Sequence, residues 1–139
     1  AELRDSTTGR DFLVFSVHFD HEGEVSRRES ARLMLRQVRE LAAGKPVICM
    51  GDYNATPESE PIRTMLAGLR DAHAHSETPP YGPVGSFNEF RFDTPADRRI
   101  DYVFLTPGIR VLKYAVLTDS QRGRYPSDHF PVLVRLQLP

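Results

Sequence analysis

The chain has 139 residues, with 18 basic and 19 acidic side chains and a formal net charge of −1 at pH 7. This length fits one domain with its own core, which we expect to span residues 1–139. The near-zero charge gives no general attraction to nucleic acid or to anionic membranes. No apolar stretch approaches the roughly 20 residues that a membrane-spanning helix needs. We therefore expect a soluble protein, either cytoplasmic or exported.

The cysteine content limits the kinds of site that this chain can form. Cys49 is the only cysteine, which excludes an internal disulfide and a cysteine-rich zinc site. Because it lies in the apolar run Val47–Met50, we expect a buried side chain rather than a reactive thiol.

The first half of the chain alternates between strand and helix patterns. Phe12–Phe19 is nearly continuous in apolar residues, as in a strand covered on both faces. Ser26–Glu29 matches a capping box, and the helix that it starts is predicted to end at Gly44. Val47–Met50 is a predicted buried strand, and Ile62–Ala67 a predicted short helix.

The second half contains strands without helices. Asp71–Arg98 has little periodicity, and a long irregular loop within a compact domain is usually either functional or wrongly assigned. Ile100–Leu105 and Ile109–Thr118 are predicted to form a hairpin around the turn Thr106–Gly108. Phe130–Leu138 is the last predicted strand. This order of elements predicts a layer of an α/β sandwich.

Four polar clusters follow or interrupt the apolar strands, where loops present side chains to a ligand. They are His18–His21, Gly51–Asn54, Arg99–Tyr102 and Ser127–His129. Asp101 lies within an otherwise apolar strand, so its carboxylate needs a partner, for which a histidine is suitable. Carboxylates, an amide and histidines together suit Mg²⁺ and a phosphate group better than zinc.

These clusters extend into four ordered motifs, Val17–His21, Gly51–Pro57, Arg99–Phe104 and Ser127–Val132. The chain thereby resembles the endonuclease/exonuclease/phosphatase superfamily. This superfamily includes the deoxyribonuclease I-like nucleases, abasic-site endonucleases, inositol polyphosphate 5-phosphatases and neutral sphingomyelinases. The resemblance implies a four-layered αββα sandwich of the deoxyribonuclease I type, an α/β fold of which this chain covers about the C-terminal half.

The resemblance also implies the hydrolysis of a phosphoester by an activated water, with Mg²⁺ as cofactor and Mn²⁺ as a substitute. His18 would bind the scissile phosphate, and Asp52 would orient or deprotonate the water. Asn54 would hold that water and a phosphate oxygen. Asp101 would fix the tautomer of His129 and stabilise its charged form near the phosphate.

Other residues are expected to bind metal or substrate. Asp128 would bind the metal, directly or through water, together with Asp52. Asn54, Asn88 and Arg99 are the predicted substrate contacts. The motifs report phosphate chemistry and not the leaving group, so nuclease, phosphodiesterase and phosphatase activities all stay open. The substrate could be a small molecule, a lipid head group or a nucleic acid.

In the superfamily, a glutamate from the N-terminal half is the principal Mg²⁺ ligand, and no glutamate of this chain lies in a similar context. We therefore expect a fragment of a longer protein or an incomplete metal site. The alternative function is a catalytically incomplete fragment or a non-catalytic binding module. A missing half would leave a sheet face exposed, either to that half or to self-association. A calcineurin-like phosphoesterase is excluded because the chain lacks a Gly-Asn-His segment and a late Gly-His-x-His segment.

Overall fold

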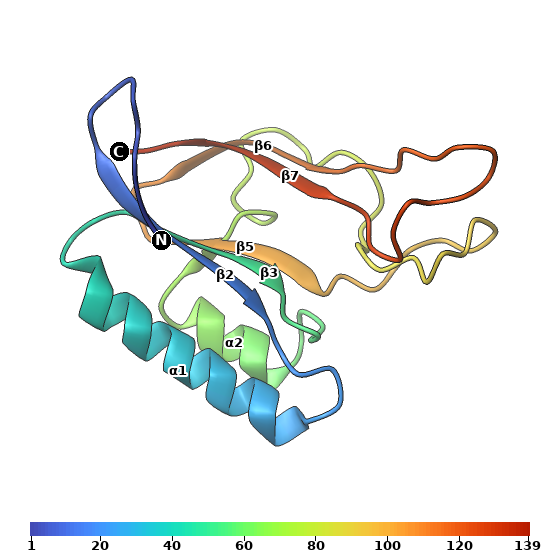
Figure 1. The fold of residues 1–139 in the computed structure, drawn as a ribbon, viewed down its shortest axis with the longest axis horizontal. Coiled ribbons are helices and arrows are strands. Elements are labelled where there is room, and N and C mark those ends of the chain that lie inside the picture. Colours follow the sequence, from blue (N-terminus) through green and yellow to red (C-terminus); the bar gives the residue numbers. More distant parts are fainter.

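The computed structural model describes residues 1–139 and arranges them in three layers, as Figure 1 shows. Helices α1 (Glu24–Ala42) and α2 (Glu60–Leu66) cover one face of a five-stranded sheet. A two-stranded sheet lies against the opposite face. These are the α, β and β layers of the expected αββα sandwich. Neither helix is long and apolar enough to cross a membrane.

The larger sheet has the strand order β1-β2-β3-β5-β4. Its strands are β1 (Glu2–Arg4), β2 (Asp11–His18), β3 (Val47–Asp52), β4 (Arg70–Asp71) and β5 (Asp101–Leu105). β2 and β3 are parallel, as expected for strands joined through helix α1, whereas β3 and β5 are antiparallel. The smaller sheet pairs β6 (Arg110–Val116) with β7 (Val132–Gln137).

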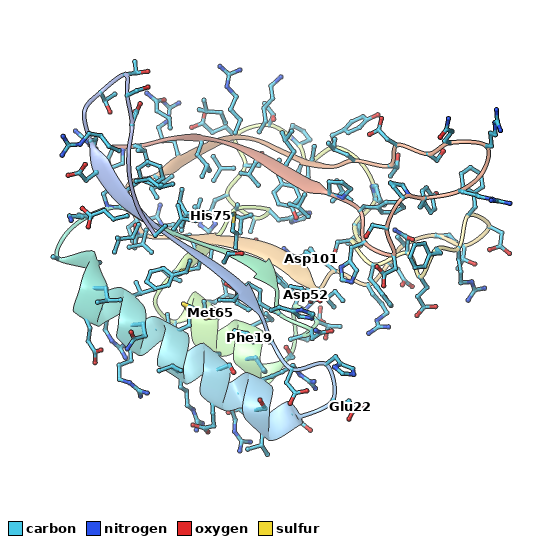
Figure 2. All side chains as sticks on the ribbon, in the orientation of Figure 1. Phe19, Glu22, Asp52, Met65, His75 and Asp101 are labelled. Atoms are coloured by element: carbon cyan, nitrogen blue, oxygen red, sulfur yellow. The ribbon has the colours of Figure 1, made fainter.

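A hydrophobic core fills each of the two interfaces between the three layers. Leu35 and Met65 belong to the core between the helices and the larger sheet, where Figure 2 labels Met65. Val103 and Val111 belong to the core between the two sheets. Cys49 is fully buried in the first core, and burial raises the pKa of its thiol to about 12. The prediction of a buried, unreactive thiol is therefore confirmed.

The predicted hairpin is wrong, because β5 and β6 lie in different sheets. β5 has β3 along one edge and β4 along the other, so it has no free edge for a third strand. After β5, the Thr106 amide donates to the Val47 carbonyl, and Gly108 turns the chain with a φ of 98° toward the second sheet. Sequence periodicity identified both strands but could not choose their partners.

Two further expectations need correction. Helix α1 begins with Gly23 as its N-cap, and Ser26 lies inside the first turn. The helix starts earlier because the Asp20 carboxylate accepts hydrogen bonds from the Glu22 and Gly23 amides. Within this chain β2 is not covered on both faces: Leu13 is buried against the helices, whereas Ser16 on the opposite face is exposed.

Candidate active site

The ends of three adjacent strands bring the first polar side chains together. His18 at the end of β2 is the register partner of Asp52 at the end of β3, and Asp52 is the register partner of Asp101 at the start of β5. Figure 2 shows Asp52 and Asp101 beside each other at this end of the sheet. Gly51 permits the arrangement, because a Cβ there would lie 1.9 Å from the Val17 carbonyl oxygen.

His129 joins this group from the loop before β7. Its Nδ1 lies 2.7 Å from Asp101 Oδ2, a distance typical of a charge-assisted hydrogen bond. Its Nε2 lies 3.9 Å from Asp52 Oδ2. The imidazole therefore has one nitrogen held by a carboxylate and the other facing a second carboxylate. The predicted pairing of Asp101 with a histidine is present in the structure.

Asn54 and His18 contact Asp52 from the other side. The backbone amide nitrogen of Asn54 donates to Asp52 Oδ1 at 2.7 Å, and the side-chain Nδ2 of Asn54 donates to the Phe19 carbonyl at 2.9 Å. Asn54 adopts a φ of 48°, a left-handed conformation that asparagine tolerates better than most residues. His18 Nε2 lies 3.4 Å from Asp52 Oδ2, and its imidazole is largely exposed. The structure thus gathers His18, Asp52 and Asn54 at one point, as expected.

The electrostatic environment of Asp52 differs from that of a surface carboxylate. Burial raises the pKa of Asp52, and the neighbouring Asp101 carboxylate raises it further. The Asn54 amide and the two histidines lower it in part. Because the net direction is upward, the Asp52 carboxylate is a better proton acceptor than an ordinary aspartate.

The predicted substrate contacts Asn88 and Arg99 are both buried. Arg99 Nη1 pairs with Asp71 Oδ2 at 2.7 Å, and its guanidinium lies over the Tyr102 ring. Asn88 Nδ2 donates to the Ser127 carbonyl, while its Oδ1 accepts from the Phe90 amide. These contacts favour positioning roles, and direct substrate binding by either residue stays a prediction.

The metal-binding capacity resides mainly in carboxylates. Ligand atoms of Asp52, Asp101 and His129 all lie within 4.8 Å of one another. The strand register that places Asp52 beside Asp101 could not be predicted from the sequence. Asp128, a predicted ligand, is not in this group, and its Oδ1 accepts from the Ser127 hydroxyl at 3.4 Å. Hard carboxylate oxygens suit Mg²⁺ or Mn²⁺, so the residues present fit a divalent ion. Asp101 is engaged by His129 through Oδ2, and both carboxylate oxygens of Asp52 accept hydrogen bonds from Asn54, so a bound ion would share these oxygens with their present partners.

Sequence reasoning missed the contribution of Ser86. This fully buried serine accepts hydrogen bonds at Oγ from the amides of Ile100 and Asp101. The only sequence signal for Ser86 is its place in the Gly85–Asn88 segment, from which Asn88 alone is a predicted substrate contact.

The sequence model of the Endonuclease/Exonuclease/phosphatase family matches residues 3–129. The chain therefore belongs to the Endonuclease/Exonuclease/phosphatase family. The family resemblance seen in the sequence and the deoxyribonuclease I-like α/β fold are both confirmed.

Solved structures of relatives superpose closely on this chain. A mannosyl-6-phosphatase of Bacteroides thetaiotaomicron is 35% identical, with a TM-score of 0.91 over 99% of this chain and 55% of its own. A conserved protein of unknown function from Enterococcus faecalis is 31% identical, with a TM-score of 0.92 over 99% of this chain and 54% of its own. Nocturnin of Drosophila melanogaster is 29% identical over 99% of this chain and 27% of its own length. The chain thus spans about half the length of the two solved relatives and about a quarter of the length of Nocturnin.

Proposed function

We propose that this protein hydrolyses a phosphoester with the help of a divalent metal ion, by in-line attack of an activated water. The observation that carries the proposal is the 2.7 Å contact between Asp101 and His129, with Asp52 facing the free Nε2 of the imidazole. This arrangement places an oriented imidazole and a carboxylate of raised pKa around one point. Phosphoryl transfer needs these groups, and the family includes a named phosphatase relative.

Asp52 and Asp128 are the residues that would hold the metal, with Mg²⁺ as the expected ion and Mn²⁺ as its substitute. A divalent ion there would neutralise negative charge that develops on the phosphate oxygens. The glutamate that the superfamily uses as principal ligand would come from a further segment of the protein.

The side chains of this chain would activate the water and bind the phosphate. Asp52 accepts a proton from the attacking water as the new P–O bond forms. The ester P–O bond breaks, and the leaving oxygen takes a proton from solvent and departs as the alcohol. Asn54 helps to hold the water, and His18 binds a phosphate oxygen. Asp101 keeps the proton of His129 on Nδ1, so that Nε2 faces the reacting group; a second proton at Nε2 would make the ring cationic and stabilise the phosphate charge.

A small phosphorylated molecule is the substrate class that we favour over a long nucleic acid. The net charge of −1 offers no general attraction to a polyanion. The relative named as a mannosyl-6-phosphatase, at 35% identity, supports a sugar phosphate as the first substrate to test.

The same proposal includes a partner for the open face of the larger sheet. An open cavity of about 440 Å³ lies between the two sheets, lined by Ser16 and Met50 on one side and by Val132 on the other. It reaches Asp101 and His129, and Met50 is 41% exposed. Because the solved relatives are nearly twice as long as this chain, we propose that a further segment of the protein covers this face and completes the metal site.

The function is tested by measuring hydrolysis of bis(p-nitrophenyl) phosphate, p-nitrophenyl phosphate and mannose 6-phosphate with Mg²⁺ and then with EDTA. The 139-residue chain and the longest natural form of the protein are each compared with their His129→Ala variants. We expect His129→Ala to lower kcat by at least about 10²-fold, as for the loss of an acid–base group. His21→Ala is the matched control, because this exposed histidine contacts only Glu22.

Three outcomes are informative. Activity of the long form alone supports the proposal and the need for a covering segment. Activity of both forms supports the proposal and shows that the segment is dispensable. A long form that hydrolyses none of these esters, although folded and supplied with metal, contradicts the proposal and favours the alternative of a non-catalytic binding module.

A further inference from the structure

The two members of the Asp101–His129 pair come from different parts of the sandwich. Asp101 begins β5 of the larger sheet, whereas His129 lies in the loop that leads into β7 of the smaller sheet. A third element that contacts both backbones across this boundary can hold the 2.7 Å contact in place. The segment Ser86–Asn88 occupies that place, since Phe87 forms antiparallel bridges both to Arg98 and to His129.

Ser86 contacts the backbone on both sides of the boundary. Its side chain is fully buried, and its Oγ accepts from the Ile100 amide at 3.3 Å and from the Asp101 amide at 3.2 Å. Its carbonyl accepts from the Phe130 amide at 2.7 Å. One residue therefore contacts the backbone of Asp101 itself and of the residue that follows His129.

The next two residues extend the same connection. The Phe87 ring lies 5.0 Å from the His129 ring, edge to face, and limits the rotation of the imidazole. The Asn88 amide donates to the Asp128 carbonyl at 2.8 Å, and Asn88 Nδ2 donates to the Ser127 carbonyl at 3.2 Å. The Ser127–His129 backbone is thus held from one side by this segment.

Gly85 shows how closely the segment approaches the chain that leads into β5. A Cβ at this position would lie 2.5 Å from the Arg98 amide nitrogen and 2.7 Å from the Ala96 carbonyl oxygen. Both neighbours are backbone atoms, so neither can move aside as a flexible side chain could. Only glycine permits this distance, which allows Ser86 to reach the Asp101 amide.

We propose that Ser86–Asn88 is the positioning element of the Asp101–His129 pair and that the Ser86 hydroxyl is its central group. By accepting the Asp101 amide, Ser86 fixes the backbone from which the carboxylate must reach Nδ1 of His129. Its effect on turnover rests on the proposed function. Its effect on the geometry of His129 does not, and can be measured without any substrate.

The test compares Ser86→Ala with Ser86→Thr, which keeps the hydroxyl. The control is Ser76→Ala, because the Ser76 hydroxyl is also buried but has no hydrogen-bond partner. The first readout is the tautomer of His129, measured from the ¹⁵N chemical shifts of the imidazole at one fixed neutral pH. The second is the split between kcat and KM for whichever ester the long form hydrolyses, with thermal melting to establish folding.

We expect the wild-type chain and the Ser76→Ala and Ser86→Thr variants to carry the proton on Nδ1. In Ser86→Ala we expect a clear shift of population toward Nε2, with kcat lowered at least about tenfold and KM unchanged, as for a misplaced catalytic group. Should Ser86→Ala not fold, Asn88→Ala, which removes the side-chain contact to Ser127, is expected to shift the tautomer in the same direction.

A folded Ser86→Ala chain whose His129 tautomer equals that of the wild type would overturn the inference. So would an equal shift in the Ser76→Ala control. A wild-type protein that hydrolyses nothing but shows the tautomer shift in Ser86→Ala would contradict the proposed function and leave the positioning role supported.

Discussion

Asp101 Oδ2 and His129 Nδ1 lie 2.7 Å apart, although the two residues are 28 positions apart, with Asp101 in the larger sheet and His129 in the loop that leads into β7 of the smaller sheet. The site thus depends on the packing of two layers and not on one strand. A change that moves one sheet against the other will separate the pair before it unfolds either layer.

Asp101→Asn is expected to lower kcat by at least about 10²-fold and to leave Mg²⁺ affinity nearly unchanged. The asparagine side chain can donate a hydrogen bond to Nδ1 and so favours the wrong tautomer of His129. Steady-state kinetics with a Mg²⁺ titration measures both quantities. A large loss of Mg²⁺ affinity in this variant would instead identify Asp101 as a metal ligand.

Asp52→Asn is expected to stabilise the fold at neutral pH while it lowers turnover by at least about 10²-fold. Burial raises the pKa of Asp52, so the native state binds this proton more tightly than the unfolded chain does. The wild-type unfolding free energy therefore falls as the pH rises from the ordinary aspartate pKa of about 3.9 to the raised native value. The asparagine variant does not lose this part of its unfolding free energy. The unfolding free energies of the two proteins should therefore become equal below that pH range.

Urea unfolding of the metal-free proteins at several pH values measures this difference. Asp20→Asn is a control of opposite sign, because hydrogen bonds from the Gly23 and Glu22 amides lower the pKa of Asp20. It should destabilise the protein at neutral pH and match the wild type at low pH. A metal-free Asp52→Asn protein less stable than the wild type at neutral pH would contradict the account of Asp52.

The sequence could predict which residues form the site better than how the chain brings them together. His18, Asp52 and Asp101 stand out because each places a polar group at the end of, or within, an apolar strand. The sheet in which β6 lies could not be predicted, because alternating apolar residues describe a strand and not its partner. β1 and β4, with three and two residues, are too short to show any period.

The same limit applies to the burial of Asn88 and Arg99, which the sequence did not predict. Asn88 and Arg99 have polar side chains beside motif residues, so the sequence favoured substrate contact. The structure buries both, through partners distant in sequence such as Asp71 and Ser127. Burial of a polar residue depends on those distant partners, which a linear motif does not contain.

Arg99→Ala is expected to lower the unfolding free energy by about 3 kcal/mol or more, because it leaves the buried Asp71 carboxylate without its partner. The Arg99 and Asp71 side chains are only 9% and 6% exposed. Chemical denaturation measures the loss. Arg110→Ala provides the matched comparison, since its pair with Glu77 is exposed and should contribute much less. Equal losses in the two variants would show that burial does not determine the effect.

Gly51→Ala is expected to prevent stable folding or to lower the melting temperature strongly. The glycine has a φ of 140°, and an added Cβ would lie 1.9 Å from the Val17 carbonyl oxygen. Gly9→Ala is the control, because Gly9 also has a positive φ but has open space around it. Gly9→Ala should cost only about 1 kcal/mol. A Gly51→Ala protein as stable as the Gly9→Ala protein would disprove the close approach of β2 and β3.

The central claim is that Asp52, Asp101 and His129 together form a metal-assisted site for phosphoester hydrolysis. The most direct measurement is the rate of mannose 6-phosphate and bis(p-nitrophenyl) phosphate hydrolysis by the longest natural form and its Asp52→Asn variant, each with Mg²⁺ and with EDTA. We expect Mg²⁺-dependent turnover that falls by at least about 10²-fold in the variant. Turnover that is unaffected by EDTA, or near-normal turnover by Asp52→Asn, would contradict that claim.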